Sequence, residues 1–189
     1  MSGTSSVIER FETDDPHDPR LASTAVVGTL LHTFNRAGVL VAADVHVAQR
    51  ACALVGEHDG TVALAVALAV RAVRQGSVCL DLADLVRSDA GSDPGSDADG
   101  LPWPVLDGWL ERVAASPLVA ASVVHVDGPL LYLDRYWREE GQVRTDLLVR
   151  SAAEPPPVHE PSLVATAERL FPGPSFAEQR AAALGAARQ

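Results

Sequence analysis

The side chains most often used in catalysis, histidine above all, are scattered along this 189-residue chain. The six histidines fall in predicted loops, helices, a turn and a strand, with no spacing typical of a catalytic or metal cluster. One local pairing, Glu57-His58-Asp59, is more typical of a polar turn than of a general base. The histidines are His17, His32, His46, His58, His125 and His159. We therefore predict no catalytic residue and no metal site.

Cysteine and serine give no stronger signal. Cys52 and Cys79 both lie in apolar segments, which predicts buried, reduced thiols in a cytoplasmic protein. Structural zinc would need more ligands at short spacing. Serines fall mostly in flexible segments, and the G-x-S-x-G elbow of α/β-hydrolases does not occur in the sequence.

The acidic segment 87–101 invites comparison with a calcium-binding loop. Asp97, Asp99 and Gly100 match part of the D-x-D-x-D-G order. However, the first ligand position is Gly95, and Leu106 stands where a bidentate glutamate is needed. An exposed, flexible loop is therefore the favoured interpretation.

Composition limits the classes of function. The formal net charge is −10, from 25 acidic residues against 15 basic ones, all of them arginine. This balance argues against strong autonomous binding to duplex DNA and fits a soluble domain or one that docks on a basic partner. Hydrophobic residues make up 47% of the chain, enough for a real core. No apolar run of about 18 residues suggests a membrane span, and no secretory signal is expected.

The longest apolar-periodic stretch, residues 39–85, organises the predicted fold. Asp44 is expected to cap a helix that ends at Gly56. The helix predicted over residues 61–75 is apolar on nearly all sides, which indicates burial all round. Residues 77–82 alternate and predict a short strand or an extended strap.

The flanking regions complete an α+β, mostly helical fold class: an N-terminal helix bundle, a small β-hairpin or sheet, and further C-terminal helices. Trp103 and Trp109 favour core packing over a base-stacking platform. Asp134 is expected to cap the long helix over 135–152, whose apolar face is Tyr136, Val143, Leu147 and Leu148. Four segments are expected along the chain: a disordered tail 1–20, a domain 21–152, a Pro-rich linker 153–161 and a terminal segment 162–189. The domain is expected to begin with a helix over 21–36 and to contain a helix over 105–115 and strands over 119–126 and 130–133. The terminal segment is expected to contain helices over 162–170 and 175–188, the second of which begins with a Ser175/Glu178 capping box.

Three segments, in order, resemble a known family. They are ALAVRAVRQGSVCLDL (67–82), LLYLDRYWREE (130–140) and FAEQRAAALGAA (176–187). Together they resemble the N-terminal domain of RecD, the alpha subunit of exodeoxyribonuclease V (RecBCD), over roughly residues 30–189. The phosphate loop G-x-x-x-x-G-K-[ST] of that family's motor has no match, and the chain contains no lysine. The resemblance therefore ends just before the helicase core. It implies that the terminal segment 162–189 corresponds to the helices that precede this core.

The resemblance implies a non-catalytic assembly domain of a 5′→3′ ATP-dependent DNA helicase subunit. Such a domain docks the motor on a RecC-like partner, beside a RecB-like subunit and DNA, in double-strand-break repair. No cofactor is expected in this chain, and ATP and Mg²⁺ are expected only in the full-length parent. Gln179 resembles a glutamine that reads adenine before the phosphate loop; an exposed helical glutamine is the alternative.

Two other functions remain open at this point. A helical, winged-helix-like DNA-binding module would need an exposed, basic helix after the turn, whereas residues 61–73 have a buried pattern. A free-standing small enzyme would need a pocket with a strongly perturbed acid or histidine. No membrane association is predicted.

Overall fold

The computed structural model describes residues 8–23, 28–90, 101–153 and 157–188. The chain divides into two compact units, residues 1–141 and 142–189, and each is described here by itself. The mostly helical α+β class predicted from sequence is confirmed, with a small antiparallel sheet. None of the described helices is long and apolar enough to cross a membrane. The calcium-like residues Asp97, Asp99 and Gly100 lie outside the described ranges.

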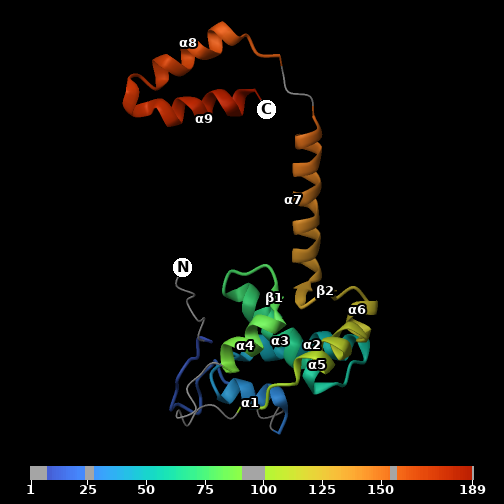
Figure 1. Ribbon diagram of the computed structural model, residues 1–189. Coiled ribbons are helices and arrows are strands. Elements are labelled where there is room, and N and C mark those ends of the chain that lie inside the picture. The colour runs from blue at the N-terminus through green and yellow to red at the C-terminus, as the bar shows by residue number, and fades with distance from the viewer. Residues whose placement is uncertain (1–7, 24–27, 91–100, 154–156, 189) are drawn as a thin grey trace. The chain divides into compact units, whose positions relative to one another are not determined.

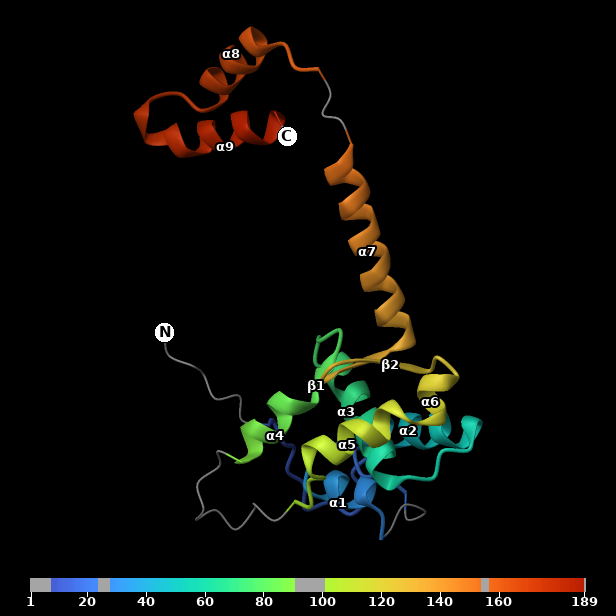
Figure 2. The same ribbon diagram turned by 45° about the vertical axis from the view of Figure 1, so that its right-hand side comes forward.

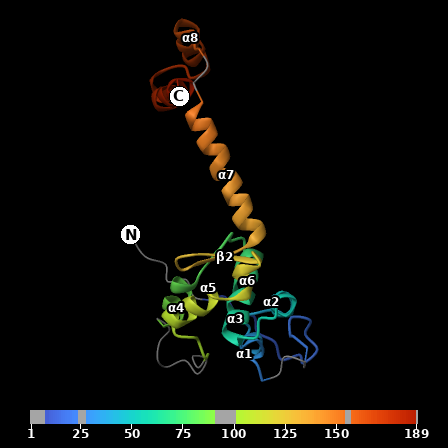
Figure 3. The same cartoon turned by 90° about the vertical axis from the view of Figure 1, so that its right-hand side faces the viewer.

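Helix α3 (Gly60–Arg74) forms the centre of the first unit (Figure 1). It packs against α1 (Leu30–Arg36), α2 (Ala42–Val55) and α5 (Leu106–Ala114). Figure 3 shows α2 on one side of α3, with α5 and α4 (Leu82–Ala90) on the other. The burial predicted from its all-round apolar sequence is confirmed. The buried residues of α3 are Val62, Leu64, Ala65, Val66, Ala67, Leu68, Ala69, Arg71 and Ala72.

The start of α2 differs from the prediction. Val41 occupies the N-cap position, and Asp44 lies inside the first turn. The Asp44 carboxylate accepts a hydrogen bond from the Val41 N–H at 2.9 Å and binds the Arg74 guanidinium of α3 at 3.0 and 3.2 Å. Asp44 therefore satisfies a free helix-end amide and a cation at once, which explains how a fully buried carboxylate is tolerated. Gly56 ends α2 in the left-handed conformation, as predicted.

Within the predicted disordered tail 1–20, the described residues begin at Ile8, and Glu9 and Phe11 are hydrogen-bonded to Arg71 of α3 and to Gly38 after α1. Ile8 is buried, and the Phe11 N–H donates to the Gly38 carbonyl oxygen at 3.0 Å. The Phe11 backbone lies so close to Gly38 that a Cβ atom at position 38 would collide with the Phe11 carbonyl oxygen.

The first helix is also shorter than predicted, beginning at Leu30 and not at residue 21. The buried Asn35 side chain explains the difference. Its Oδ1 accepts from the Ala22 N–H, and its Nδ2 donates to the carbonyl oxygens of Arg20 and Leu40. These bonds hold the chain around Ala22 outside the helix.

The predicted hairpin and its third strand are confirmed. Strand β3 (Leu130–Leu133) lies between β1 (Leu80–Asp81) and β2 (Val124–Asp127), and both neighbours are antiparallel to it (Figure 2). The strand predicted over 119–126 is shorter than expected, because α6 (Pro117–Ala120) occupies its start. The Ser116 hydroxyl caps that turn by accepting from the Leu118 N–H.

The second unit contains the end of α7 (Asp134–Ala152) and two further helices. Helices α8 (Glu160–Leu170) and α9 (Ala177–Ala187) form a hairpin through the short 3₁₀ turn η2 (Pro174–Phe176). Arg188 makes two hydrogen bonds to the Glu160 carboxylate, at 2.7 and 2.9 Å. The predicted Ser175/Glu178 capping box does not form, because η2 places Phe176 at the N-cap of α9. The unit boundary also falls within α7, before the predicted linker 153–161.

Candidate functional site

The histidine-containing turn predicted from sequence has a structural role. The Glu57 carboxylate accepts from the backbone N–H groups of His58 and Asp59 and from the Ser116 hydroxyl. Asp59 caps α3 by accepting from the Thr61 N–H at 2.7 Å. These bonds use the carboxylates to close the turn between α2 and α3. Among the described residues, no group of three acidic, histidine or cysteine side chains is arranged to hold a metal ion.

Gln179 lies on the exposed side of α9. Its neighbour Arg180 donates to the Phe171 carbonyl oxygen at 2.9 Å and so helps to close the α8–α9 hairpin. A contact between Gln179 and adenine stays a prediction for a longer protein.

The junction between the sheet and α7 is the most connected group of polar and aromatic side chains in the described part of the first unit. The Asp134 carboxylate contacts His125 Nε2 at 2.8 Å and the Arg138 guanidinium at 2.9 Å. The hydrogen bond from His125, followed by Arg138, lowers the pKa of the Asp134 carboxyl. Asp134 was expected to cap α7, but it is the first residue of that helix and joins it to β2.

Aromatic rings complete the junction. Trp137 stacks on the His125 ring with centroids 5.2 Å apart, and Tyr132 meets Trp137 edge-on at 5.1 Å. Burial raises the pKa of Tyr132 well above its ordinary value, with nearby Cys79 and Glu140 adding to the effect. With Nε2 bonded to Asp134 and its ring stacked on Trp137, His125 holds the start of α7 against the sheet.

The segment 130–140 singled out in the sequence supplies most of this junction. The hairpin register pairs His125 with Tyr132 and Val124 with Leu133, which brings the start of α7 against β2. His125 was not predicted as a junction residue. Its position nine residues before Asp134, across a Gly-containing turn, was the available signal.

Beyond the junction, α7 presents large apolar side chains to solvent. Val143, Leu147 and Leu148 of the predicted apolar face are 57%, 60% and 57% exposed, and Val149 is 65% exposed. No residue of α7 is buried. Exposed apolar side chains on one stripe of a helix are typical of a protein-binding surface. Val143, Leu147 and Leu148 fall on such a stripe, and we call them the α7 apolar face; Val149 lies on another side of the helix.

The charged side chains of α7 largely pair within the helix. Arg135 binds Glu139 at 2.8 Å, Arg138 binds Asp134, and Gln142 binds Asp146. Such exposed pairs contribute little free energy and leave the helix surface nearly neutral. These pairs form a solvated, salt-bridged surface along α7.

Comparisons with known proteins agree with the sequence pattern. The model of the family described as "RecBCD enzyme subunit RecD, N-terminal domain" matches residues 36–135. The chain is 53% identical over 156 residues to the RecBCD enzyme subunit RecD of Mycobacterium tuberculosis. The aligned residues cover 82% of this chain and 25% of that protein. It is 51% identical to the corresponding subunit of Mycolicibacterium smegmatis, covering 82% of this chain and 26% of that protein.

The chain thus spans about a quarter of the length of the curated relatives it matches. No solved structure matches it. The matched residues 36–135 run from the last residue of α1 through the sheet and into the first turn of α7. On this match, the chain belongs to the family of RecD N-terminal domains of the RecBCD enzyme.

Proposed function

We propose that this chain is a non-catalytic assembly domain of a RecD-like, 5′→3′ ATP-dependent DNA helicase subunit of exodeoxyribonuclease V. Its role is to dock the motor on a RecC-like partner, within a complex that also contains a RecB-like subunit and DNA. ATP and Mg²⁺ serve the motor in the full-length parent, and the complex acts in double-strand-break repair. The family membership supports this proposal, because the relatives are named as subunits of one multi-subunit enzyme.

The observation that carries the proposal is the α7 apolar face. Its three aliphatic side chains, Val143, Leu147 and Leu148, are each more than half exposed and leave apolar area in water. Covering that area on a partner would stabilise a complex. The internally paired charges beside it lose little when the helix is covered, because their partners travel with them.

The DNA-binding alternative requires an exposed helix after the turn. That helix is α3, which is buried, and Arg74 at its end is paired with Asp44. A recognition helix in a major groove must present its side chains to base edges, so α3 is unsuitable in this arrangement.

The test is association with the RecC-like subunit encoded in the same genome. Both proteins are co-expressed, and the complex is isolated on a tagged RecC-like subunit and analysed by size exclusion. We expect the folded chain to co-elute. If a chain with native helical content elutes alone, the docking role is overturned.

A matched pair of variants locates the surface. Leu147→Asp places a charge in the α7 apolar face, and Leu54→Asp places one on α2, where Leu54 is 70% exposed. Both changes exchange an exposed helical leucine for aspartate, so they alter solubility and helix propensity similarly. We expect Leu147→Asp to weaken association about tenfold or more and Leu54→Asp to leave it nearly unchanged. Equal effects would place the docking surface elsewhere.

A further inference from the structure

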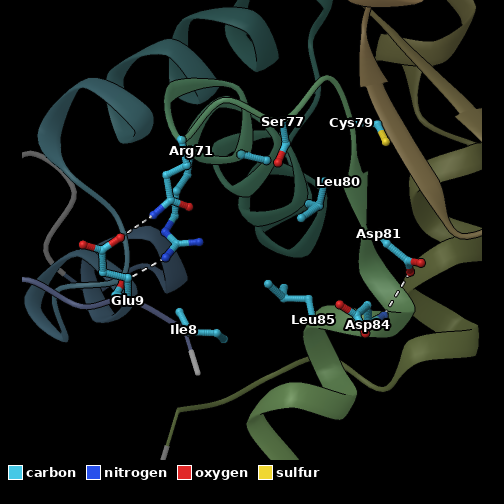
Figure 4. A pocket seen from close by; sticks show the side chains of 11 residues that line it. Ile8, Glu9, Arg71, Ser77, Cys79, Leu80, Asp81, Asp84 and Leu85 are labelled. Atoms are coloured by element: carbon cyan, nitrogen blue, oxygen red, sulfur yellow. Dashed lines mark hydrogen bonds between the residues drawn. The ribbon is translucent and has the colours of Figure 1, made fainter. Parts of the chain in front are cut away.

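A cavity of about 500 Å³ lies beside the end of α3 (Figure 4). The N-terminal segment, the end of α3, β1 and the start of α4 each contribute to its wall. Its size is in the range of small-molecule sites in proteins. Its apolar wall is formed by Ile8, Ala72, Leu80 and Leu85.

A buried cation lines this cavity. Arg71 is only 7% exposed, and its Nη2 donates to the Glu9 carbonyl oxygen at 2.8 Å. A guanidinium has five N–H donors, so a bond to one neutral carbonyl leaves most of its capacity unused. Within the described ranges Arg71 makes no ion pair, whereas its neighbour Arg74 is paired with Asp44.

The electrostatic state of Arg71 agrees with this geometry. Burial, followed by the like charge of Arg74, lowers the pKa of the Arg71 guanidinium below its ordinary value. Asp44 and Glu9 act in the opposite direction without cancelling the effect of burial. A buried, under-compensated cation at a cavity wall favours an anionic group inside the cavity.

The opposite side of the cavity limits the charge of that group. Asp81 and Asp84 lie across from Arg71 and Glu9 in Figure 4. Asp81 uses its Oδ1 to accept from the backbone N–H groups of Ala83 and Asp84, so its charge is held in place. The Asp84 carboxylate is already paired with Arg87 at 3.4 Å. Arg71 can therefore pair with one carboxylate, but a second negative charge on the ligand would face Asp81, which disfavours phosphates and dicarboxylates.

We propose that this cavity binds a small organic monocarboxylate, with its carboxylate on Arg71 and its apolar body against Ile8, Leu80 and Leu85. A planar guanidinium can bind a carboxylate through two parallel hydrogen bonds. The apolar wall then excludes water from that pair, which strengthens it.

Four probes of equal chain length separate the contributions. Hexanoate, hexanol, hexylamine and adipate are titrated into the 189-residue chain, and binding is followed by thermal denaturation and by the methyl NMR signals of Ile8, Leu80 and Leu85. We expect hexanoate to raise the melting temperature and to shift these methyl signals saturably. Hexanol should bind about tenfold or more weakly, because it lacks the charge-assisted pair. Adipate and hexylamine should not compete with hexanoate.

Two variants in the segment between α3 and β1 test the location of the binding site and leave Arg71 unchanged. Ser77→Phe fills the cavity from an exposed position on its wall, and Val78→Phe adds the same ring at the next residue, which does not line the cavity. We expect hexanoate binding to be lost in Ser77→Phe and retained in Val78→Phe. Arg71→Met should also abolish the preference for hexanoate over hexanol if it folds. Equal shifts by all four probes, no saturable binding at millimolar hexanoate, or equal binding by Ser77→Phe and Val78→Phe would overturn the proposal.

Discussion

Helix α3 buries residues on nearly every side, whereas α7 buries none. The two helices are similar in length, and each carries arginines near its C-terminal end. On α3 those arginines contact other segments: Arg71 the N-terminal segment and Arg74 the buried Asp44. On α7 the described ion pairs lie near the start of the helix, where Arg135 and Arg138 bind acidic residues one turn away.

The difference shows what stabilises each region. Around α3 the favourable free energy comes from apolar area removed from water, and buried polar groups are retained because they are paired. Along α7 the isolated chain has helix propensity and exposed ion pairs, each contributing a few tenths of a kcal/mol. The first region has its own apolar core, and the second exposes apolar side chains to solvent.

The largest effect should follow from opening a cavity at the centre of α3. Leu68 is 1% exposed, and Leu68→Ala should lower the free energy of unfolding by about 2–5 kcal/mol. Leu64→Met, which nearly conserves volume at a neighbouring buried site, should cost less than about 1.5 kcal/mol. Urea denaturation followed by circular dichroism measures both. If the two variants are equally stable, the core is not centred on α3.

The next effect concerns the junction that joins these two regions. Trp137→Ala removes the ring contacts to His125 and Tyr132 and should cost about 2 kcal/mol. It should also speed amide hydrogen exchange at residues 138–141. Tyr136→Ala is the matched control. Tyr136 is also an aromatic residue near the start of α7, but the contact described for its ring is with the Arg135 guanidinium of the same helix. Identical exchange in the two variants would show that the Trp137 contacts do not hold the start of α7.

Sequence predicted the elements of the first region well, because its signals are local. The all-apolar pattern of α3 and the presence of a hairpin around Gly128 were predicted correctly, although β2 begins only at Val124. The N-terminal segment was not, because its placement depends on Asn35, whose side chain contacts residues 13 and 15 positions away. Hydrogen bonds across that separation leave no periodic pattern in the sequence.

The candidate surface was predicted in part. Periodicity placed Val143, Leu147 and Leu148 among the residues of an apolar face, but a period gives no information on what covers a face. The contact between His125 and Asp134 depends on hairpin register, which short strands specify weakly in the sequence. The sequence therefore identified the helix and not the way in which it is attached.

A smaller effect should appear at acidic pH, at the cap of α3. The Thr61 side chain, with its backbone amide and Arg112 adding further, holds the pKa of the Asp59 carboxyl below its ordinary value. The stability that results is fully present above the pKa of Asp59 in the unfolded chain, about 4. It is lost as the pH falls through the lower pKa of Asp59 in the folded chain. Asp59→Asn keeps a good cap but cannot titrate. Its unfolding free energy should fall less than that of the wild type between pH 4 and pH 2, and identical slopes would exclude Asp59 as a source.

The smallest effect should follow from the change that most directly tests the contrast between α3 and α7. Leu147→Ala removes an exposed side chain and improves helix propensity, so the unfolding free energy of the isolated chain should change by no more than about 0.5 kcal/mol. The same leucine-to-alanine exchange at Leu68 serves as the reference under identical conditions. A loss of about 2 kcal/mol or more at Leu147 would place that side chain in a packed environment. The α7 apolar face would then already be covered in the isolated chain, and the need for a partner to cover it would disappear.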